Sequence, residues 1–166
     1  MESEMKRHYY EHGVRIFQID RMGLFSEIHE ARDSNAARLK VAGALRSFAN
    51  KMGDVAVIIY SQVNADAERT SHKRPEAHQI YGATAIQANC TKACIIYRPD
   101  GYSMSNFEAG PYEGTMAKGL AEVYTVLNNY GDLGSSLVKF NALTQQFENY
   151  GQQDLQEDSA TTVGTG

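Results

Sequence analysis

Several features that would place this chain in a common class are scarce or missing. No stretch of its 166 residues approaches the ~18 consecutive apolar residues of a membrane-spanning helix. The N-terminal sequence MESEMKRHYY has no apolar core, which argues against secretion. The formal net charge is −4, so any contact with nucleic acid must come from a local basic patch. We therefore expect no membrane partner and a cytoplasmic location.

Cysteine is also rare. Cys90 and Cys94 lie close together and do not form the framework of an extracellular disulfide-rich domain. We expect a reduced pair, and a metal site on this pair is the alternative. No internal repeat is visible. The length supports one domain with a core, over 1–149, and the small, acidic and polar residues 150–166 predict a disordered tail.

The apolar residues that are present predict alternating helices and strands. Met1, Met5 and Tyr9 have helical spacing before Gly13, and a strand is expected over 14–20. A longer helix is expected to begin at Asp33 or Ser34 and to end at Gly53. The following sequence DVAVIIYSQV is continuously apolar, which is typical of a parallel strand covered on both faces.

The second half of the chain predicts a different kind of pairing. A polar loop with a helix after Pro75 leads to a third apolar strand over 93–97. AEVYTVL and SLVKF flank NNYGDLG, which is typical of an antiparallel hairpin. The fold class predicted is therefore α/β, a layered fold with flanking helices whose mixed sheet starts parallel and ends antiparallel.

Two polar residues end the first two predicted strands. Asp20 closes the first and Gln62 the second, and ligands bind beyond the carboxyl ends of parallel strands. A carboxylate there can hold Mg²⁺ through water, and an amide on the neighbouring strand can sense a terminal phosphate. Such a site also needs a phosphate-binding loop, G-x-x-x-x-G-K-[ST], and the sequence contains none.

A second motif points to different chemistry. HYYEH, with His8, Glu11 and His12, fits the H-x-x-E-H pattern of one class of zinc peptidase. Spacing singles out no third ligand, and the helix that carries the motif ends at Gly13. A zinc peptidase is therefore the weakest functional alternative.

The order of these segments resembles the C-terminal portion of the RecA-like ATPase domain of DnaB-type replicative helicases. YYEHGVRIFQIDRMGLF resembles the helix and Walker B segment of that family, and the long helix with its IIYSQV strand is similar to the segment that carries the phosphate-sensing glutamine. KRPEAHQIYGATAIQANCTKACIIYR resembles the segment with the DNA-contacting loop, and AEVYTVLNNYGDLGSSLVKF the final hairpin. The resemblance covers about 10–149, apart from an apparent insertion at 101–118.

The resemblance implies a role for each motif. Asp20 and Gln62 are the expected catalytic and nucleotide-contacting residues, with ATP and Mg²⁺ as cofactors and Asp20 holding the metal through water. The implied DNA contacts are Arg69, Lys73, Arg74, Tyr81, Gly82 and Thr84. The implied protein is part of an ATP-dependent helicase, phage-like and hexameric, that unwinds duplex DNA by moving along one strand in a bacterium or a phage-infected host. Its expected partners are single-stranded DNA and either further copies in a ring or a separate chain with the P-loop half.

The sequence departs from the family pattern in three places, and these departures support a second functional hypothesis. The P-loop half has no counterpart, so the chain alone is expected to be inactive. Leu127 and Asn129 replace a lysine and an arginine that reach the neighbouring subunit's nucleotide, although Asn129 is kept as a candidate contact. Tyr81 and Gly82 replace an Arg-Glu pair; Tyr81 either stacks on a base or packs within the protein. A degenerate module for assembly or DNA contact is therefore the second functional hypothesis.

One structural expectation follows from the missing half. In RecA-like sheets the P-loop strand separates the strands that correspond here to 55–61 and 93–97. Without it, these two strands are expected to pair directly or to accept a strand from a partner chain, because each buried unpaired main-chain group costs about 1–3 kcal/mol.

Overall fold

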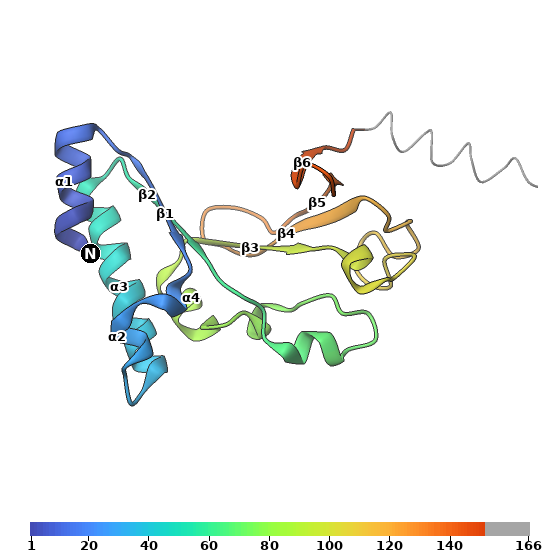
Figure 1. Cartoon of the computed structure of the whole chain (residues 1–166), viewed down its shortest axis with the longest axis horizontal. Helices are drawn as coiled ribbons and strands as arrows, with labels where there is room; N and C mark the ends of the chain where they lie inside the picture. The colour runs from blue at the N-terminus through green and yellow to red at the C-terminus, as the bar shows by residue number, and fades with distance from the viewer. Residues whose placement is uncertain (152–166) are drawn as a thin grey trace, which may run out of the picture.

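A computed structural model describes residues 1–151 and shows an α/β fold with two separate sheets (Figure 1). Helices and two parallel strands form the N-terminal part, and an antiparallel sheet forms the C-terminal part. The predicted tail, 150–166, lies outside the described residues except for Tyr150 and Gly151, and Tyr150 is partly buried against the second core. Within the described residues, no helix has the length and apolar character needed to cross a membrane.

The two predicted N-terminal helices and their ends are confirmed. Helix α1, Glu2–His12, ends at Gly13, which adopts the left-handed conformation (φ 68°, ψ 20°) that costs glycine little. Helix α3, Ser34–Met52, begins at Asp33, whose carboxylate accepts hydrogen bonds from the main-chain N–H groups of Asn35 and Ala36.

The first sheet is parallel, as predicted. Strand β1, Ile16–Asp20, pairs with β2, Ala56–Tyr60, so that Ile16 lies opposite Ala56 and Asp20 opposite Tyr60. Alternate side chains of both strands pack on the buried stripe of α3, which includes Val41, Leu45 and Phe48. The Phe17 and Phe48 rings meet edge to face, 5.6 Å apart. The face of the sheet away from α3 has no cover within the described residues, so the prediction that β2 is covered on both faces is not met by this chain alone.

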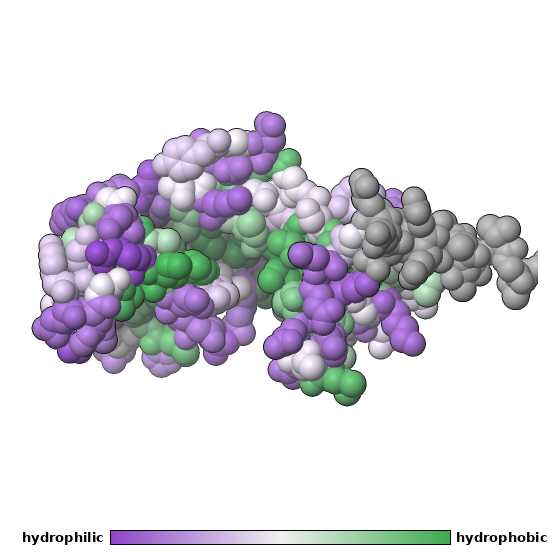
Figure 2. Space-filling view, turned by 90° about the horizontal axis from the view of Figure 1, so that it is seen from above, coloured by the Kyte–Doolittle hydropathy of each residue, from purple (hydrophilic) through white to green (hydrophobic). Residues whose placement is uncertain are grey.

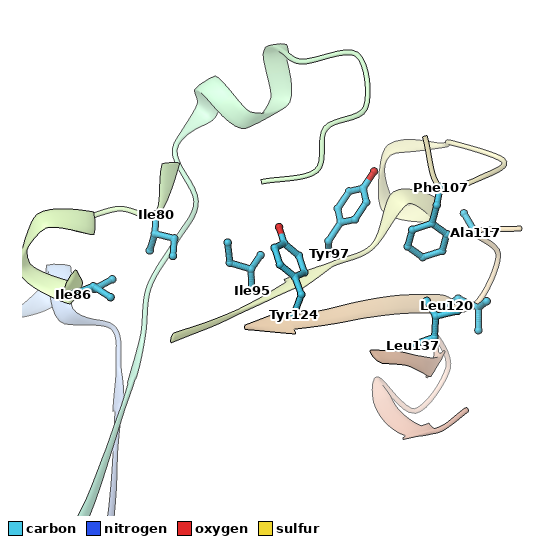
Figure 3. Packing of buried hydrophobic residues seen from close by; sticks show 9 residues of the cluster. All are labelled: Ile80, Ile86, Ile95, Tyr97, Phe107, Ala117, Leu120, Tyr124 and Leu137. Atoms are coloured by element: carbon cyan, nitrogen blue, oxygen red, sulfur yellow. The ribbon is translucent and has the colours of Figure 1, made fainter. Parts of the chain in front are cut away.

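The second sheet is antiparallel and contains the predicted third strand and hairpin. Its order is β3 (Lys92–Tyr97), β4 (Leu120–Asn128), β5 (Ser135–Asn141) and β6 (Gln146–Asn149). One face of this sheet packs against the region around helix α4, Ala83–Asn89, and against the segment that follows β3 (Figure 3). Strand β6 carries no strong sequence signal and was not predicted.

Of the two alternatives predicted for the strands 55–61 and 93–97, direct pairing is wrong, and pairing with a strand of a partner chain stays a prediction. Within the described residues β2 pairs only with β1 and β3 only with β4, so the parallel and antiparallel strands form two sheets instead of one. Arg46 of α3 donates a hydrogen bond to the Asn89 carbonyl at the end of α4, which holds the start of β3 beside the helices. From there β3 pairs along its whole length with the longer β4.

Short helical turns complete the structure. They are η1 (Met22–Leu24), α2 (Ser26–His29), η2 (Ala65–Arg69), η3 (Ala77–Gln79) and η4 (Pro99–Tyr102). The apparent insertion, 101–118, is part of the core: Phe107 is 1% exposed and meets the Tyr97 ring edge to face. A bridge between Asn106 and Met116 closes this segment on itself.

Candidate functional site

Asp20 and Gln62 lie at the same edge of the first sheet, as predicted. Asp20 is the last residue of β1, opposite Tyr60 of β2, and Gln62 follows Tyr60 by two residues. Because the strands are parallel, both side chains stand at their carboxyl ends. Both residues are exposed. A carboxylate and an amide are therefore presented to solvent at the edge where such sheets bind ligands.

The main chain beyond β2 is hydrogen-bonded to the loop that contains Tyr81. The Tyr81 N–H donates to the Gln62 carbonyl (2.7 Å), and the Ser61 hydroxyl donates to the Tyr81 carbonyl (2.7 Å). One residue further, Val63 and Ile80 form an antiparallel bridge. The position of Tyr81 is thus fixed directly by the segment that carries Gln62.

The turn after Asp20 reaches the same tyrosine. Gly23 lies so close to the Tyr81 ring that an added Cβ would be 3.6 Å from Cε1, an ordinary contact distance. Tyr81 therefore touches the segments that follow both strands. The two strand ends and the loop form one connected region.

Arg38 of α3 holds the Tyr81 ring. Its guanidinium carbon is 4.0 Å from the ring centroid, a cation–π contact, and Nη2 donates to the Tyr81 hydroxyl. Nη1 donates to the Asn35 side chain at 2.7 Å, and Nε, although buried, has no hydrogen-bond partner in the described structure. Arg38 is only 6% exposed, whereas Tyr81 is 41% exposed. One part of the tyrosine is therefore packed within the protein and another part remains accessible to solvent, and its stacking on a base stays a prediction.

Gly82 gives the chain the turn that this packing requires. Its φ of 81° lies in the left-handed region, and an added Cβ would be 3.2 Å from the Arg38 side chain. The next amide, of Ala83, already donates to the Ile80 carbonyl, so it is not directed toward a ligand. Thr84, which follows it, is exposed.

Arg74 has a partner inside the protein. Its Nε and Nη2 bind the two carboxylate oxygens of Glu122 at 2.7 and 2.8 Å, and Glu122 is fully buried on β4. Ser135 donates to the same carboxylate at 2.6 Å, and the guanidinium lies 3.9 Å from the Tyr124 ring centroid. The hydrogen bonds that Arg74 donates to Glu122 raise the pKa of Arg74, and burial raises the pKa of Tyr124. The structure thus uses Arg74 to attach the loop to the second sheet, and its predicted contact with DNA stays a prediction.

The other predicted cationic contacts are nearer to solvent. Arg69 has an 81% exposed side chain and pairs with Asp66 at 2.9 Å. Lys73 adopts a positive φ of 49°, and its ammonium group donates to the Glu68 carbonyl at 2.9 Å. An exposed ion pair such as Arg69–Asp66 contributes little to stability. Arg69 and Lys73 are therefore better placed than Arg74 to contact a nucleic acid.

Asn129 lies in the other sheet. It follows β4, its side chain is exposed and its N–H donates to the Thr91 carbonyl at 2.9 Å. Leu127 lies opposite Ala93 of β3 in the same sheet. Neither residue belongs to the sheet that carries Asp20 and Gln62, so within this chain the structure does not bring Asn129 into that site.

The histidine motif on α1 gains no third ligand. His8 and His12 lie with their ring centroids 5.5 Å apart, and Glu11 is 3.6 Å from Arg7 and 3.8 Å from His12. Residues 1–151 contain no group of three His, Cys, Asp or Glu side chains placed to hold a metal ion. Cys90 is partly buried and Cys94 is exposed, and both are free thiols.

Sequence reasoning missed two residues that organise this region. Arg38 was only one of the polar positions of a long helix, and its contact with Tyr81 joins residues 43 positions apart. Glu122 offered a signal that was not used: it is a charged residue inside the apolar strand AEVYTVL. A carboxylate at such a position needs a buried partner, because an unpaired charge in the interior is costly.

Comparison with known proteins gives a consistent family. The family model described as "DnaB-like helicase C terminal domain" matches residues 1–149. The replicative DNA helicase DnaB of Buchnera aphidicola subsp. Acyrthosiphon pisum is 24% identical over 151 residues, which are 90% of this chain and 31% of the relative. The Pasteurella multocida protein of the same name is 24% identical over 160 residues, 95% of this chain and 32% of the relative. The chain spans about a third of the length of these curated relatives.

Solved structures give the same fold. One of them, described as an ATPase domain and called the reference ATPase domain below, has a TM-score of 0.75 at 20% identity, and the match covers 90% of this chain and 50% of that one. A DnaB-like replicative helicase, described with its interactions with primase, matches with a TM-score of 0.75 at 20% identity and covers 90% of this chain and 34% of that one. The likeness extends over nearly the whole described chain and about half of the reference ATPase domain.

Proposed function

The chain belongs to the DnaB-like helicase C-terminal domain family, and from this premise we propose that it supplies the Walker B, sensor and DNA-loop half of a helicase ATPase site. Asp20 holds Mg²⁺ through water, and Gln62 contacts the terminal phosphate of ATP. The loop 69–84 contacts single-stranded DNA. The parts of this proposal that the fold supports are the shared sheet edge of Asp20 and Gln62 and its connection to the loop.

The residues at the sheet edge fit a hydrated magnesium ion. Mg²⁺ keeps several of its waters and is commonly bound by one or two carboxylates together with substrate phosphates. Asp20 is an exposed carboxylate of this kind, and Gln62 can donate its amide N–H to a phosphate oxygen. Bound Mg·ATP would supply the phosphoryl group that is transferred to water, and this chain's residues orient and sense it.

The observation that carries the proposal is a main-chain hydrogen bond between the segment that contains Gln62 and the loop that contains Tyr81. The Gln62 carbonyl accepts from the Tyr81 N–H at 2.7 Å, so a shift of Gln62 toward or away from a phosphate displaces Tyr81 as well. Arg38 holds the same tyrosine against α3. In this proposal ATP turnover is therefore coupled to the binding of one DNA strand through the hydrogen bond between Gln62 and Tyr81.

The sequence limits what the chain does by itself. It has no G-x-x-x-x-G-K-[ST] loop, which in other proteins gives the phosphates a ring of main-chain N–H groups and a lysine. We infer that the chain alone neither binds ATP tightly nor hydrolyses it. Full activity requires the P-loop half, in a ring of phage-like, hexameric architecture that moves on single-stranded DNA in the bacterial cytoplasm.

DNA binding tests the loop assignment. A fluorescent oligothymidine should bind the purified chain weakly, and its affinity should fall steeply between about 50 and 200 mM salt, because contacts to phosphates release counterions. Lys73→Ala should weaken binding and flatten the salt dependence. Lys6→Ala, which removes an exposed lysine of α1, is the matched control and should change neither. Equal affinity at both salt concentrations would contradict the proposal.

ATP turnover separates the catalytic proposal from its rival. Leu127 and Asn129 stand where the family has a lysine and an arginine, which favours a module that assembles or contacts DNA without catalysis. In a ring completed with a P-loop half, Asp20→Ala should abolish ATP hydrolysis if the first proposal holds. No turnover by the wild-type assembly would favour the rival. Turnover by the isolated chain that depends on Asp20 would contradict the need for a P-loop half.

A further inference from the structure

Arg38 is a buried cation whose charge has no carboxylate partner among residues 1–151. It is 6% exposed, and its Nη1 donates to the side-chain oxygen of Asn35 at 2.7 Å. Its Nη2 donates to the Tyr81 hydroxyl, and its buried Nε has no hydrogen-bond partner in this part of the chain. Leaving a buried charge unpaired is costly, so such a group normally has a partner of opposite charge. Among the described residues the Arg38 guanidinium lacks this anion.

The hydrogen bond between Arg38 and Tyr81 leaves the tyrosine hydroxyl with a hydrogen to donate. A guanidinium has only donors, so the Tyr81 oxygen is the acceptor in this bond. The hydroxyl hydrogen must then point elsewhere, and no acceptor for it is found within 1–151. A hydroxyl that accepts a bond from a cation is polarised, and it donates more strongly to its next partner.

Exposure alone does not distinguish Tyr81 from other aromatic residues of this chain. Tyr81 is 41% exposed, whereas Tyr10 is 72% and Tyr130 84% exposed. Figure 2 shows further hydrophobic surface in the middle of the molecule, between polar regions. What sets Tyr81 apart from Tyr10 and Tyr130 is the guanidinium carbon of Arg38, 4.0 Å from its ring centroid. A hydroxyl donor on a partly exposed side chain is thus placed next to a buried positive charge.

We propose that Arg38 and Tyr81 together bind a phosphate oxygen, at a position that we call the phosphate site. Tyr81 donates its hydroxyl hydrogen to the phosphate. Arg38 is a positioning residue that orients this hydroxyl and supplies the balancing positive charge. A phosphate fits because its ionised oxygens accept hydrogen bonds and carry the negative charge that Arg38 lacks. This inference rests on the proposed function, in which phosphates of DNA and of ATP come close to Tyr81.

Two kinds of phosphate can reach the phosphate site. The loop 69–84 is proposed to contact single-stranded DNA, whose backbone carries a phosphodiester at each nucleotide. The Tyr81 main chain is also bonded to the Gln62 carbonyl, and Gly23, which follows Asp20, lies beside the Tyr81 ring. The terminal phosphate of ATP is therefore the second source. Both sources present the same chemistry to the hydroxyl, so they are separated by experiment.

NMR of the tyrosine rings observes the hydroxyl directly. The full chain is labelled with ¹³C at Cζ, the ring carbon that carries the hydroxyl, and the Tyr81 signal is identified among the 10 tyrosines by its loss in Tyr81→Phe. Oligothymidine and Mg·ATP are added separately, and the titration detects weak as well as tight binding. We expect the Tyr81 signal to shift with at least one of them, and the ligand that shifts it identifies the source. A signal that responds to neither ligand would overturn the proposal.

Affinities from the same titrations test the role of each residue. Tyr81→Phe and Arg38→Met should each weaken binding of the ligand that shifts the signal by about tenfold or more, as expected for a hydrogen bond to a charged group. The double variant should be no weaker than the weaker single variant, because the two residues act as one unit. Tyr130→Phe and Arg7→Met are the matched controls, since Arg7 is an exposed arginine of α1 and its loss changes the net charge equally.

Salt dependence separates the proposed role of Arg38 from a purely structural one. Arg38→Met should flatten the dependence of affinity on salt, because a phosphate held near its charge releases counterions. Arg7→Met should leave this dependence unchanged. Circular dichroism verifies that Arg38→Met is folded, and Tyr81→Phe, which keeps the ring, tests the site without disturbing the packing.

Other results would assign the two residues differently. If Tyr81→Phe binds oligothymidine as tightly as the wild type while Tyr81→Leu binds weakly, the ring stacks on a base, and the proposal is overturned. Equal affinities and equal salt dependence for Arg38→Met and Arg7→Met would remove Arg38 from the phosphate site.

The phosphate site and the proposed function fail separately. Salt-dependent binding of oligothymidine that is the same in wild type, Tyr81→Phe and Arg38→Met would refute the phosphate site and keep the DNA role of the loop. A Tyr81 signal that shifts with Mg·ATP, in a chain that does not bind oligothymidine, would refute the DNA role and keep the phosphate site.

Discussion

The parallel β1–β2 sheet and the antiparallel β3–β6 sheet both expose isoleucines, but the exposure has a different meaning in each. Antiparallel sheets commonly have one face on the core and one in water, so the exposed Ile96 of β3 is ordinary. Parallel strands are normally covered on both faces, so the exposure of Ile16 and Ile58 is unusual for this type of strand. The same residue type at similar exposure is thus informative in one sheet and not in the other.

The two sheets also differ in how their cores are built. The first packs on α3 through apolar side chains, with Phe17 and Phe48 at its centre. The second buries an ion pair, Arg74 with Glu122, and the hydroxyl of Tyr124, which donates to the Pro75 carbonyl. Apolar packing holds an element in place through shape, whereas the buried polar network attaches one particular loop. This difference can be tested by substitution in each core.

The largest effect is expected in the apolar core. Phe48 is 1% exposed, so Phe48→Ala should lower the free energy of unfolding by about 3–5 kcal/mol through the lost transfer energy and the cavity it leaves. Leu39→Ala, at a 37% exposed position of the same helix, is the control and should cost much less. Urea unfolding followed by circular dichroism measures both. Similar losses for the two variants would show that α3 is not packed as described.

A slightly smaller effect is expected from the buried ion pair. Glu122→Ala should lower the free energy of unfolding by about 3 kcal/mol, because it leaves the Arg74 charge without its partner. Substituting both residues, Arg74→Met with Glu122→Leu, should recover most of this loss. Glu148→Ala on the exposed strand β6 should cost little. If the double variant is no more stable than Glu122→Ala, the charge is not the cause.

The third prediction concerns pH. Tyr97 is 1% exposed and its hydroxyl donates to the His72 carbonyl, so Tyr97→Phe should cost about 1 kcal/mol at neutral pH. Burial raises the pKa of Tyr97 from 10.0 to about 12. The folded state therefore holds this proton more tightly, and its contribution is present below pH 10 and lost as the pH rises toward 12.

Unfolding free energies between about pH 9 and 12 test this sign, within the range set by that pKa shift. The wild-type chain should lose more stability over this range than Tyr97→Phe. Tyr130→Phe, at an 84% exposed position, should follow the wild type. Parallel curves for Tyr97→Phe and wild type would contradict the assignment.

The smallest effect is expected on the face of the β1–β2 sheet that points away from α3, where Ile58 is exposed. Ile58→Thr should change the free energy of unfolding of the isolated chain by less than about 0.5 kcal/mol, because the side chain has no cover to lose. Its neighbour Ile59 points to α3, and Ile59→Thr should cost more than about 1 kcal/mol. Equal costs would show that the face of the sheet with Ile58 is already covered in the isolated chain.

Local signals made much of this fold predictable. Gly13 and Asp33 mark helix ends through their own backbone and side-chain chemistry, and the rule for parallel strands placed Asp20 and Gln62 at one edge. Of the two alternatives expected for β2, direct pairing with β3 is not formed, and no local sequence signal distinguished it from pairing with a strand of a partner chain.

The candidate site was predictable only at its strand ends. The contacts of Arg38 with Tyr81 and of Arg74 with Glu122 span 43 and 48 positions, and neither has a local spacing pattern. The resemblance and the charge of Arg74 indicated a DNA contact, and neither reveals that its guanidinium also binds the buried carboxylate of Glu122. The glutamate inside an apolar strand was the one sequence signal for this ion pair.

Gly110 of the inserted segment has a consequence for protein engineering. An added Cβ there would lie 2.7 Å from Arg74 Nε, and its φ of 89° also favours glycine. The insertion thus fits over the arginine that attaches the loop leading to Tyr81. A chimaera that transplants residues 73–84 into a relative would have to carry 99–118 and Glu122 with it, because these segments contact one another although they are separate in the sequence.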